Sequence, residues 1–265
     1  MVSRRNVLGH VARLGACSAT AGFCLHARAV NPSSVGCIDS ADYAAIKVDG
    51  RTVQVSNHKS RIPIYQSDDR QLDSFIWEAC RKISRVFGVL PELCYVADES
   101  EGPYGNAWAV TPMNAPARLP PNPHGAVLLG VKMMRTLSQR VENPELALAA
   151  ICAHEYGHIL QFVSNGLINK IKGVQITNRR IELQADYFAG YFAGRMKSQK
   201  PSYSAQAFAS TLFNAGDTNL TKPDHHGTHE QRGRAVQEGY NSAYQFDLSV
   251  SDVIEESAGY VQRLY

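Results

Sequence analysis

The feature that most constrains this chain is an apolar segment, residues 144–163, that contains two histidines and a glutamate. Its central part, residues 150–161, reads AICAHEYGHILQ. Apolar residues on both sides predict a helix packed into a core. Burying a polar side chain in a core costs free energy unless its hydrogen bonds or its charge are satisfied. The fold must therefore have a specific use for His154, Glu155 and His158.

The two histidines stand four residues apart, so on a helix their rings point about 40° apart and lie roughly 6 Å apart along the axis. Two imidazoles placed in this way can point at one cation, as in the pattern H-E-x-x-H. The metal expected for this pattern is zinc, which lowers the pKa of a bound water molecule towards neutrality. Glu155 borders the same face and can take the proton of that water. The motif predicts one zinc ion held by His154 and His158, with Glu155 as the general base.

A catalytic zinc site normally has three protein ligands and one open position. Glu182 is the best third ligand, because it lies at the start of the next strong helical segment, residues 178–197. A turn of the chain between the two segments can bring this helix back against the first. Asp186 follows Glu182 by four residues and shares its helix face. We expect Asp186 to accept the outer N–H of a ligand histidine and so to fix its tautomer.

Three blocks of the sequence carry a resemblance to a known family. HEYGHILQ, RRIELQADYFAGYFAG and THEQRGRAVQEGY occur in the order seen in the bacterial family of neutral zinc metallopeptidases. The wider gluzincin clan, including HtpX-type peptidases, looks similar, and there a Glu-x-x-Ala-Asp segment supplies the third ligand. The resemblance covers residues 104–245 and implies a zincin-like fold that hydrolyses peptide bonds.

The same resemblance implies roles outside the two helices. Asn106-Ala-Trp-Ala is similar to the clan's edge strand, which pairs with extended substrate, so Asn106 is expected to bind substrate. His226 followed by Arg232 is similar to the clan's His-Pro…Arg element, although a glycine replaces the proline. By resemblance, His226 steadies the oxyanion and Arg232 anchors helices. His225 and His229 flank this position, and the sequence leaves open which of the three histidines approaches the metal.

The rest of the chain predicts an α+β fold that is mostly helical with a small β-sheet. A length of 265 residues, with 44% hydrophobic and 19% charged residues, is typical of one soluble domain. Hydrophobic periodicity predicts helices over residues 68–87, 133–139, 144–163, 178–197, 205–214, 228–244 and 252–264. It predicts strands over residues 93–97, 106–110 and 126–131, and a hairpin over residues 44–48 and 52–55 around Asp49-Gly50.

The N-terminal residues 1–29 resemble a twin-arginine export signal. They begin with Ser3-Arg4-Arg5 and end in the small-x-small pattern Ala27-Arg28-Ala29. A cytosolic N-terminal helix and a lipoprotein signal at Cys17 are the weaker alternatives. We therefore expect an exported protein, periplasmic or secreted, whose mature domain is residues 30–265 and has no transmembrane anchor. The four arginines of this segment exceed the net charge of +3, so without them the chain carries −1 and predicts no nucleic-acid partner.

Four cysteines remain after residue 29: Cys37, Cys80, Cys94 and Cys152. In an oxidising compartment they allow three pairings, of which Cys80 with Cys94 is the reasonable one. Cys152 is expected to be a buried apolar residue, because two residues on a helix place it about 200° away from His154. Tyr156 is expected to pack in the core, and His58 and His124 are expected at the surface.

These observations predict an exported monozinc endopeptidase that acts on peptides or proteins. Two other functions remain open on the sequence. One is a non-catalytic scaffold or binding protein that is stabilised by zinc. The other keeps the metal chemistry but hydrolyses a cell-wall peptide or amide. The sequence does not indicate the substrate, a regulatory pro-segment or the oligomeric state.

Overall fold

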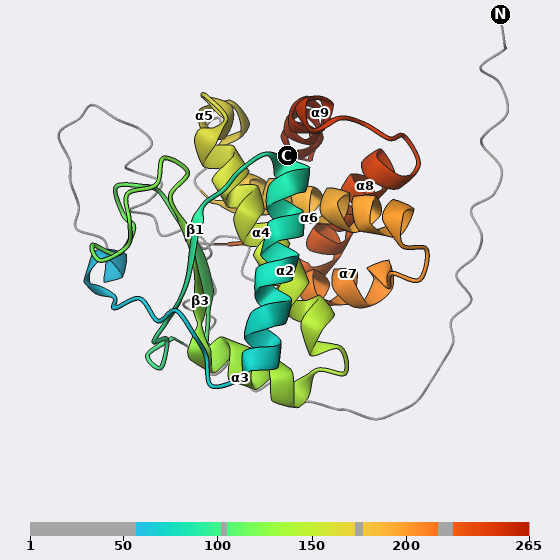
Figure 1. Ribbon diagram of the computed structural model, residues 1–265. Helices are drawn as coiled ribbons and strands as arrows, with labels where there is room; N and C mark the ends of the chain where they lie inside the picture. Colours follow the sequence, from blue (N-terminus) through green and yellow to red (C-terminus); the bar gives the residue numbers. More distant parts are fainter. Residues whose placement is uncertain (1–56, 102–104, 173–176, 217–224, 265) are drawn as a thin grey trace, which may run out of the picture. The chain divides into compact units, whose positions relative to one another are not determined.

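The computed structural model describes residues 57–101, 105–172, 177–216 and 225–264 (Figure 1). This part of the chain is mostly helical with a small sheet, which confirms the expected α+β class. Its helices are η1 (Asn57–Ser60, a 3-10 turn), α2 (Arg70–Phe87), α3 (Val131–Arg140), α4 (Pro144–Val163), α5 (Leu167–Lys172), α6 (Arg179–Gln199), α7 (Ala205–Asn214), α8 (His229–Tyr244) and α9 (Val250–Arg263). Its strands are β1 (Glu92–Val96), β2 (Ala107–Val110) and β3 (Ala126–Gly130).

The three strands form one sheet in the order β1-β3-β2. β1 pairs with β3 in parallel, and β2 pairs with β3 antiparallel, with Trp108 opposite Leu128. Successive side chains of a strand point to opposite faces. Leu93 and Tyr95 accordingly join the main helical core, whereas Cys94 joins a second apolar cluster with Trp108 on the other face. The sheet is thus buried on both faces, and β2 is an edge strand of its described part.

Helix α4 lies between the sheet and α6, and α2 packs beside it (Figure 1). Pro144 occupies its first turn, where the missing N–H is not needed. A Cβ added at Gly157 would come within 3.1 Å of the Ala185 backbone, so a glycine between the two histidines lets α6 approach closely. Among the described helices, α4 alone is long and apolar enough to cross a membrane, but most of it is buried inside this fold. It therefore has the character of a core helix.

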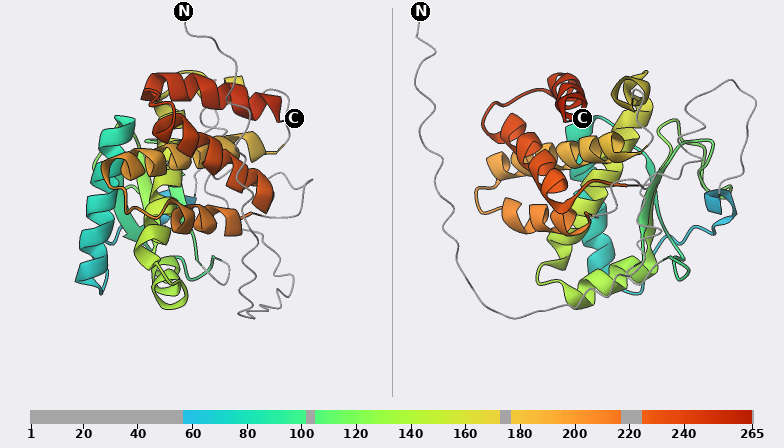
Figure 2. Two further views of the ribbon diagram at one scale, coloured as in Figure 1. Left: turned by 90° about the vertical axis from the view of Figure 1, so that its right-hand side faces the viewer. Right: turned by 180° about the vertical axis from the view of Figure 1, so that it is seen from behind.

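Helix α6 is the second central element, with α8 and α9 beside it on the side away from the sheet (Figure 2). The contact between α6 and α8 is the most extensive one among the described elements. A Cβ added at Gly190 would lie 2.0 Å from the Val236 carbonyl oxygen, so only glycine allows the backbones to meet. A capping box of Thr228 and Gln231 starts α8 and fixes where that helix begins.

Most of the elements predicted from the sequence are present with shifts of one or two residues at their ends. The short helix α5 was not predicted. The expected hairpin over residues 44–55 and the expected signal over residues 1–29 lie outside the described residues, as does Cys37. Two predictions are wrong. Cys80, Cys94 and Cys152 are all free and buried, so Cys80 does not pair with Cys94. His58 is buried rather than exposed, with its ring 5.4 Å from that of Trp108.

The reason for the wrong disulfide is the alternation of side chains along β1. Cys80 lies in the main core with Cys152, whereas Cys94 points to the opposite face of the sheet. The two sulfurs therefore belong to different layers. Cys152 and Tyr156 are core residues on α4, as expected.

Candidate metal centre

Three side chains from α4 and α6 converge in the core, and together they could hold a metal ion. His154 and His158 lie on α4, Glu182 lies in the first turn of α6, and all three are buried. One ligand atom of each lies within 4.8 Å of those of the other two. Glu182 Oε2 is 3.3 Å from His154 Nε2, and Glu182 Oε1 is 3.6 Å from His158 Nε2. The group has the composition expected from the sequence.

His154 is supported by a charged pair. Its Nδ1 lies 2.7 Å from Asp186 Oδ1. Arg232 on α8 donates to the same carboxylate twice, from Nε to Oδ2 at 2.7 Å and from a terminal nitrogen to Oδ1 at 2.8 Å. Because the paired carboxylate is only an acceptor, the neutral imidazole of His154 carries its proton on Nδ1 and leaves Nε2 available to a metal. Asp186 thus has the contact expected of it, and the Arg232 guanidinium adds the countercharge.

His158 is supported by a neutral group. Its Nδ1 lies 2.8 Å from Oε1 of Gln161, three residues further along α4. An amide oxygen accepts, so His158 also carries its proton on Nδ1. Gln161 was missed in the sequence reading. A signal was available, because it is one more polar residue in the apolar helix and lies one turn from His158.

The two Nε2 atoms face each other at 3.1 Å. Two imidazole nitrogens bound to one tetrahedral zinc at about 2.0–2.1 Å would lie roughly 3.3 Å apart. Two lone pairs and a buried carboxylate directed at the same point repel one another unless a proton or a metal ion lies between them. The donor set of two nitrogens and one carboxylate could therefore hold a metal ion.

The ionisation of the group also favours positive charge at this point. Burial lowers the pKa of His154, but Asp186 outweighs it and raises that pKa to about 9. Burial would raise the pKa of Glu182, yet the imidazoles of His226 and His158 hold it well below its usual value. Glu182 is thus an anionic ligand at neutral pH, and a cation at the centre would replace the proton that His154 otherwise attracts.

The remaining predicted residues lie as follows. Glu155 is fully buried on α4 beside His154. His226 is buried, and it is among the causes that lower the pKa of Glu182. His229 is turned towards α7, since its Nδ1 lies 2.7 Å from the Phe213 carbonyl oxygen. His225 is fully buried. Which of the three clustered histidines approaches the metal therefore stays open.

Asn106 immediately precedes the edge strand β2 and is buried. Its backbone N–H donates to Asp98 Oδ2 at 2.9 Å, and its Oδ1 accepts from the N–H of Ala107 at 2.9 Å. Asp98 also accepts from the backbone N–H groups of Lys132 and Met133 at the start of α3. Asn106 is thus held firmly at the start of β2, and its predicted contact with substrate remains a prediction.

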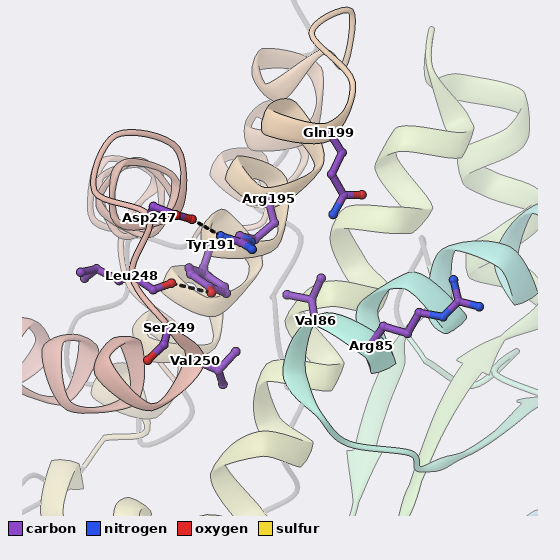
Figure 3. A pocket seen from close by; sticks show the side chains of 9 residues that line it. All are labelled: Arg85, Val86, Tyr191, Arg195, Gln199, Asp247, Leu248, Ser249 and Val250. Atoms are coloured by element: carbon purple, nitrogen blue, oxygen red, sulfur yellow. Dashed lines mark hydrogen bonds and ion pairs between the residues drawn. The ribbon is translucent and has the colours of Figure 1, made fainter.

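A surface pocket lies away from this centre, between α2, α6 and the loop before α9 (Figure 3). Arg195 pairs there with Asp247, and the Tyr191 hydroxyl donates to the Leu248 carbonyl at 2.8 Å. None of the three ligand residues lines it. This pocket is therefore separate from the candidate metal centre.

Comparisons with known proteins add no family. No protein-family model, curated protein or solved structure matches this sequence. The functional argument therefore depends on the residues of the centre and on the three sequence blocks.

Proposed function

We propose that the protein is a zinc-dependent peptidase, in which His154, His158 and Glu182 hold one zinc ion. The observation that carries the proposal is the convergence of two Nε2 atoms, 3.1 Å apart, with the Glu182 carboxylate within 3.6 Å of both. Zinc bound there would supply Lewis acidity, which polarises a peptide carbonyl and makes a water molecule a better nucleophile.

The chain's own residues would then move the protons. Glu155 is the proposed general base, because it is the residue next to His154 on α4, the helix that carries both imidazoles. His226 is the proposed donor to the negative charge that develops on the carbonyl oxygen. Asp186 and Gln161 hold the two imidazoles in the tautomer that leaves Nε2 available.

An extended peptide is the proposed substrate class. β2 is antiparallel to β3 at an edge of the described sheet, and such an edge can pair with an extended chain. This arrangement also allows the cross-link peptides of a cell wall. Export of the protein stays a proposal that rests on the sequence of residues 1–29.

The experiment is a comparison of the wild type with Glu155→Gln on a protein and peptide mixture. We expect the variant to retain one zinc ion per chain and to lose peptide cleavage, because only the base is removed. Cleavage by the variant at the wild-type rate would refute Glu155 as the base. Absence of stoichiometric zinc from the wild type would refute the metal assignment itself.

A zinc-stabilised scaffold is the second candidate, and the burial of the centre favours it. His154, Glu155 and Glu182 are each at most 1% exposed, and the groups around them come from α4, α6 and α8. A zinc ion in such a place contributes to folding. A wild-type protein that contains zinc and unfolds on chelation, but cleaves no peptide in the mixture, would support this candidate over the peptidase.

A further inference from the structure

A chain of buried polar side chains runs from His158 to the last helix. Gln161 Oε1 lies 2.8 Å from His158 Nδ1, and Gln161 Nε2 donates to Gln184 Oε1 at 3.0 Å. Gln184 Nε2 donates to Ser257 Oγ at 3.0 Å, and Ser257 Oγ donates to the Ile254 carbonyl at 3.0 Å. The side chains belong to α4, α6 and α9, and all are at most 1% exposed. The metal-facing histidine is thus connected to the C-terminal helix.

The direction of every hydrogen bond in this chain is fixed by its two backbone carbonyls. A carbonyl only accepts, so Ser257 must give its single proton to Ile254 and must accept from Gln184. Gln184 therefore turns its oxygen to Gln161. Gln161 Nε2 also donates to the Ile181 carbonyl at 2.8 Å, so this nitrogen must point towards α6. Its oxygen then faces His158, so the two backbone carbonyls fix which end of each amide faces its partner.

We propose that Gln161 is a positioning residue for the zinc site, and that Gln184 and Ser257 keep its amide from flipping. This inference rests on the proposed function. A flipped Gln161 would present its NH₂ group to His158 Nδ1 and would move the imidazole proton to Nε2, where it opposes metal binding. The chain therefore selects the tautomer of His158 that can bind a metal.

Gln161 also aligns the third ligand. The carbonyl that accepts from its nitrogen belongs to Ile181, the residue before Glu182. One amide thus bonds a metal-facing histidine of α4 and the backbone that carries the carboxylate ligand on α6. Displacing it loosens the relation between the two helices at the point where their ligands converge.

The test is the zinc affinity of the full chain, measured by withdrawing zinc from the loaded protein with a competing chromophoric chelator. Gln161→Met keeps the volume and removes the amide, and we expect it to weaken zinc binding about 10–100-fold. Gln161→Glu keeps an acceptor for the His158 N–H and should recover part of that loss. Ser257→Ala lies at the far end of the chain and should give a smaller loss. Gln237→Leu, on the exposed face of α8, is the control and should bind zinc as the wild type does.

A second measurement separates positioning from general stability. In the zinc-loaded wild type we expect a low-field proton resonance from the hydrogen-bonded Nδ1–H of His158. That resonance should be lost or shifted in Gln161→Met and kept in Gln237→Leu. Wild-type zinc affinity together with an unchanged resonance in both Gln161→Met and Ser257→Ala would overturn the proposal. A wild type without zinc would instead refute the proposed function, so the two failures are distinguishable.

Discussion

The two histidines of the centre are supported in opposite ways. His154 is held by a charged pair, Asp186 with Arg232, which joins α6 to α8. His158 is held by the neutral amide of Gln161, whose bonds lead through α6 to α9. Both supports fix the same tautomer. A buried carboxylate such as Asp186 needs a countercharge. A buried amide such as Gln161 needs only hydrogen bonds that fix which way its oxygen and nitrogen point, and backbone carbonyls provide these.

Mutation of the two supports should therefore reduce the stability of the fold by different amounts. Removing one member of a buried ion pair leaves a charge without compensation, which costs more than one lost neutral hydrogen bond.

The largest effect is expected for Arg232→Leu, which leaves the Asp186 carboxylate without its guanidinium partner. We expect a loss of about 3–5 kcal/mol in the free energy of unfolding, measured with urea. Arg234→Leu, an exposed arginine on the same helix, is the matched control and should change stability little. Equal stability of the two variants would contradict a buried ion pair at Arg232.

The next effect tests how α8 brings Arg232 to α6. Gly190→Ala places a methyl group against the Val236 carbonyl, and we expect about 1–3 kcal/mol of destabilisation from overpacking. Gly259→Ala on α9 is the control, because its added carbon meets only the end of the Arg263 side chain, 3.1 Å away. It should be neutral or slightly stabilising, since alanine is the better helix former. An equal response at both glycines would argue against the close α6–α8 contact.

A smaller effect is expected for Gln184→Leu in the neutral support. Ser257 then loses its donor and Gln161 one of its acceptors, at a cost of about 1–3 kcal/mol in the same urea experiment. The loss should be smaller than that of Arg232→Leu. A larger loss would reverse the comparison between the charged and neutral supports.

The last prediction concerns how the stability of the fold changes at acid pH. Burial raises the pKa of Asp186, but Arg232 and His154 outweigh it and lower that pKa below the ordinary value of 3.8. A depressed pKa stabilises the fold above the unfolded-state value, and the gain is lost as the pH falls through the folded-state value. Asp186→Asn should therefore show a flatter decline of stability below about pH 4 than the wild type. Gln184→Leu should decline in parallel with the wild type, and identical slopes in all three proteins would contradict the assignment.

The sequence predicted the long helices and the residues that share one helix face, because both follow from helical periodicity. The apolar spacing predicted α2, α4 and α6 closely, and the four-residue spacings put His154 with His158 and Glu182 with Asp186. The six-residue helix α5 is too short for periodicity to show. The partners of the sheet also could not be read, because the parallel pairing of β1 with β3 joins segments far apart in the chain.

The errors came from side-chain direction and from long-range contacts. Cys94 was paired with Cys80 although alternation along the strand turns it to the other face. His58 was assigned to the surface because its contact with Trp108 is made across fifty residues of sequence. The support of His158 also depends on long-range contacts, since Gln184 meets Gln161, and Ser257 meets Gln184, only once three helices have packed.

The most direct test of the central claim is zinc K-edge X-ray absorption on the purified wild-type protein, with metal analysis of the same sample. The account predicts one zinc ion per chain with two imidazole nitrogens and oxygen ligands, and no sulfur. A zinc–sulfur shell, or a chain that binds no stoichiometric zinc, would contradict it.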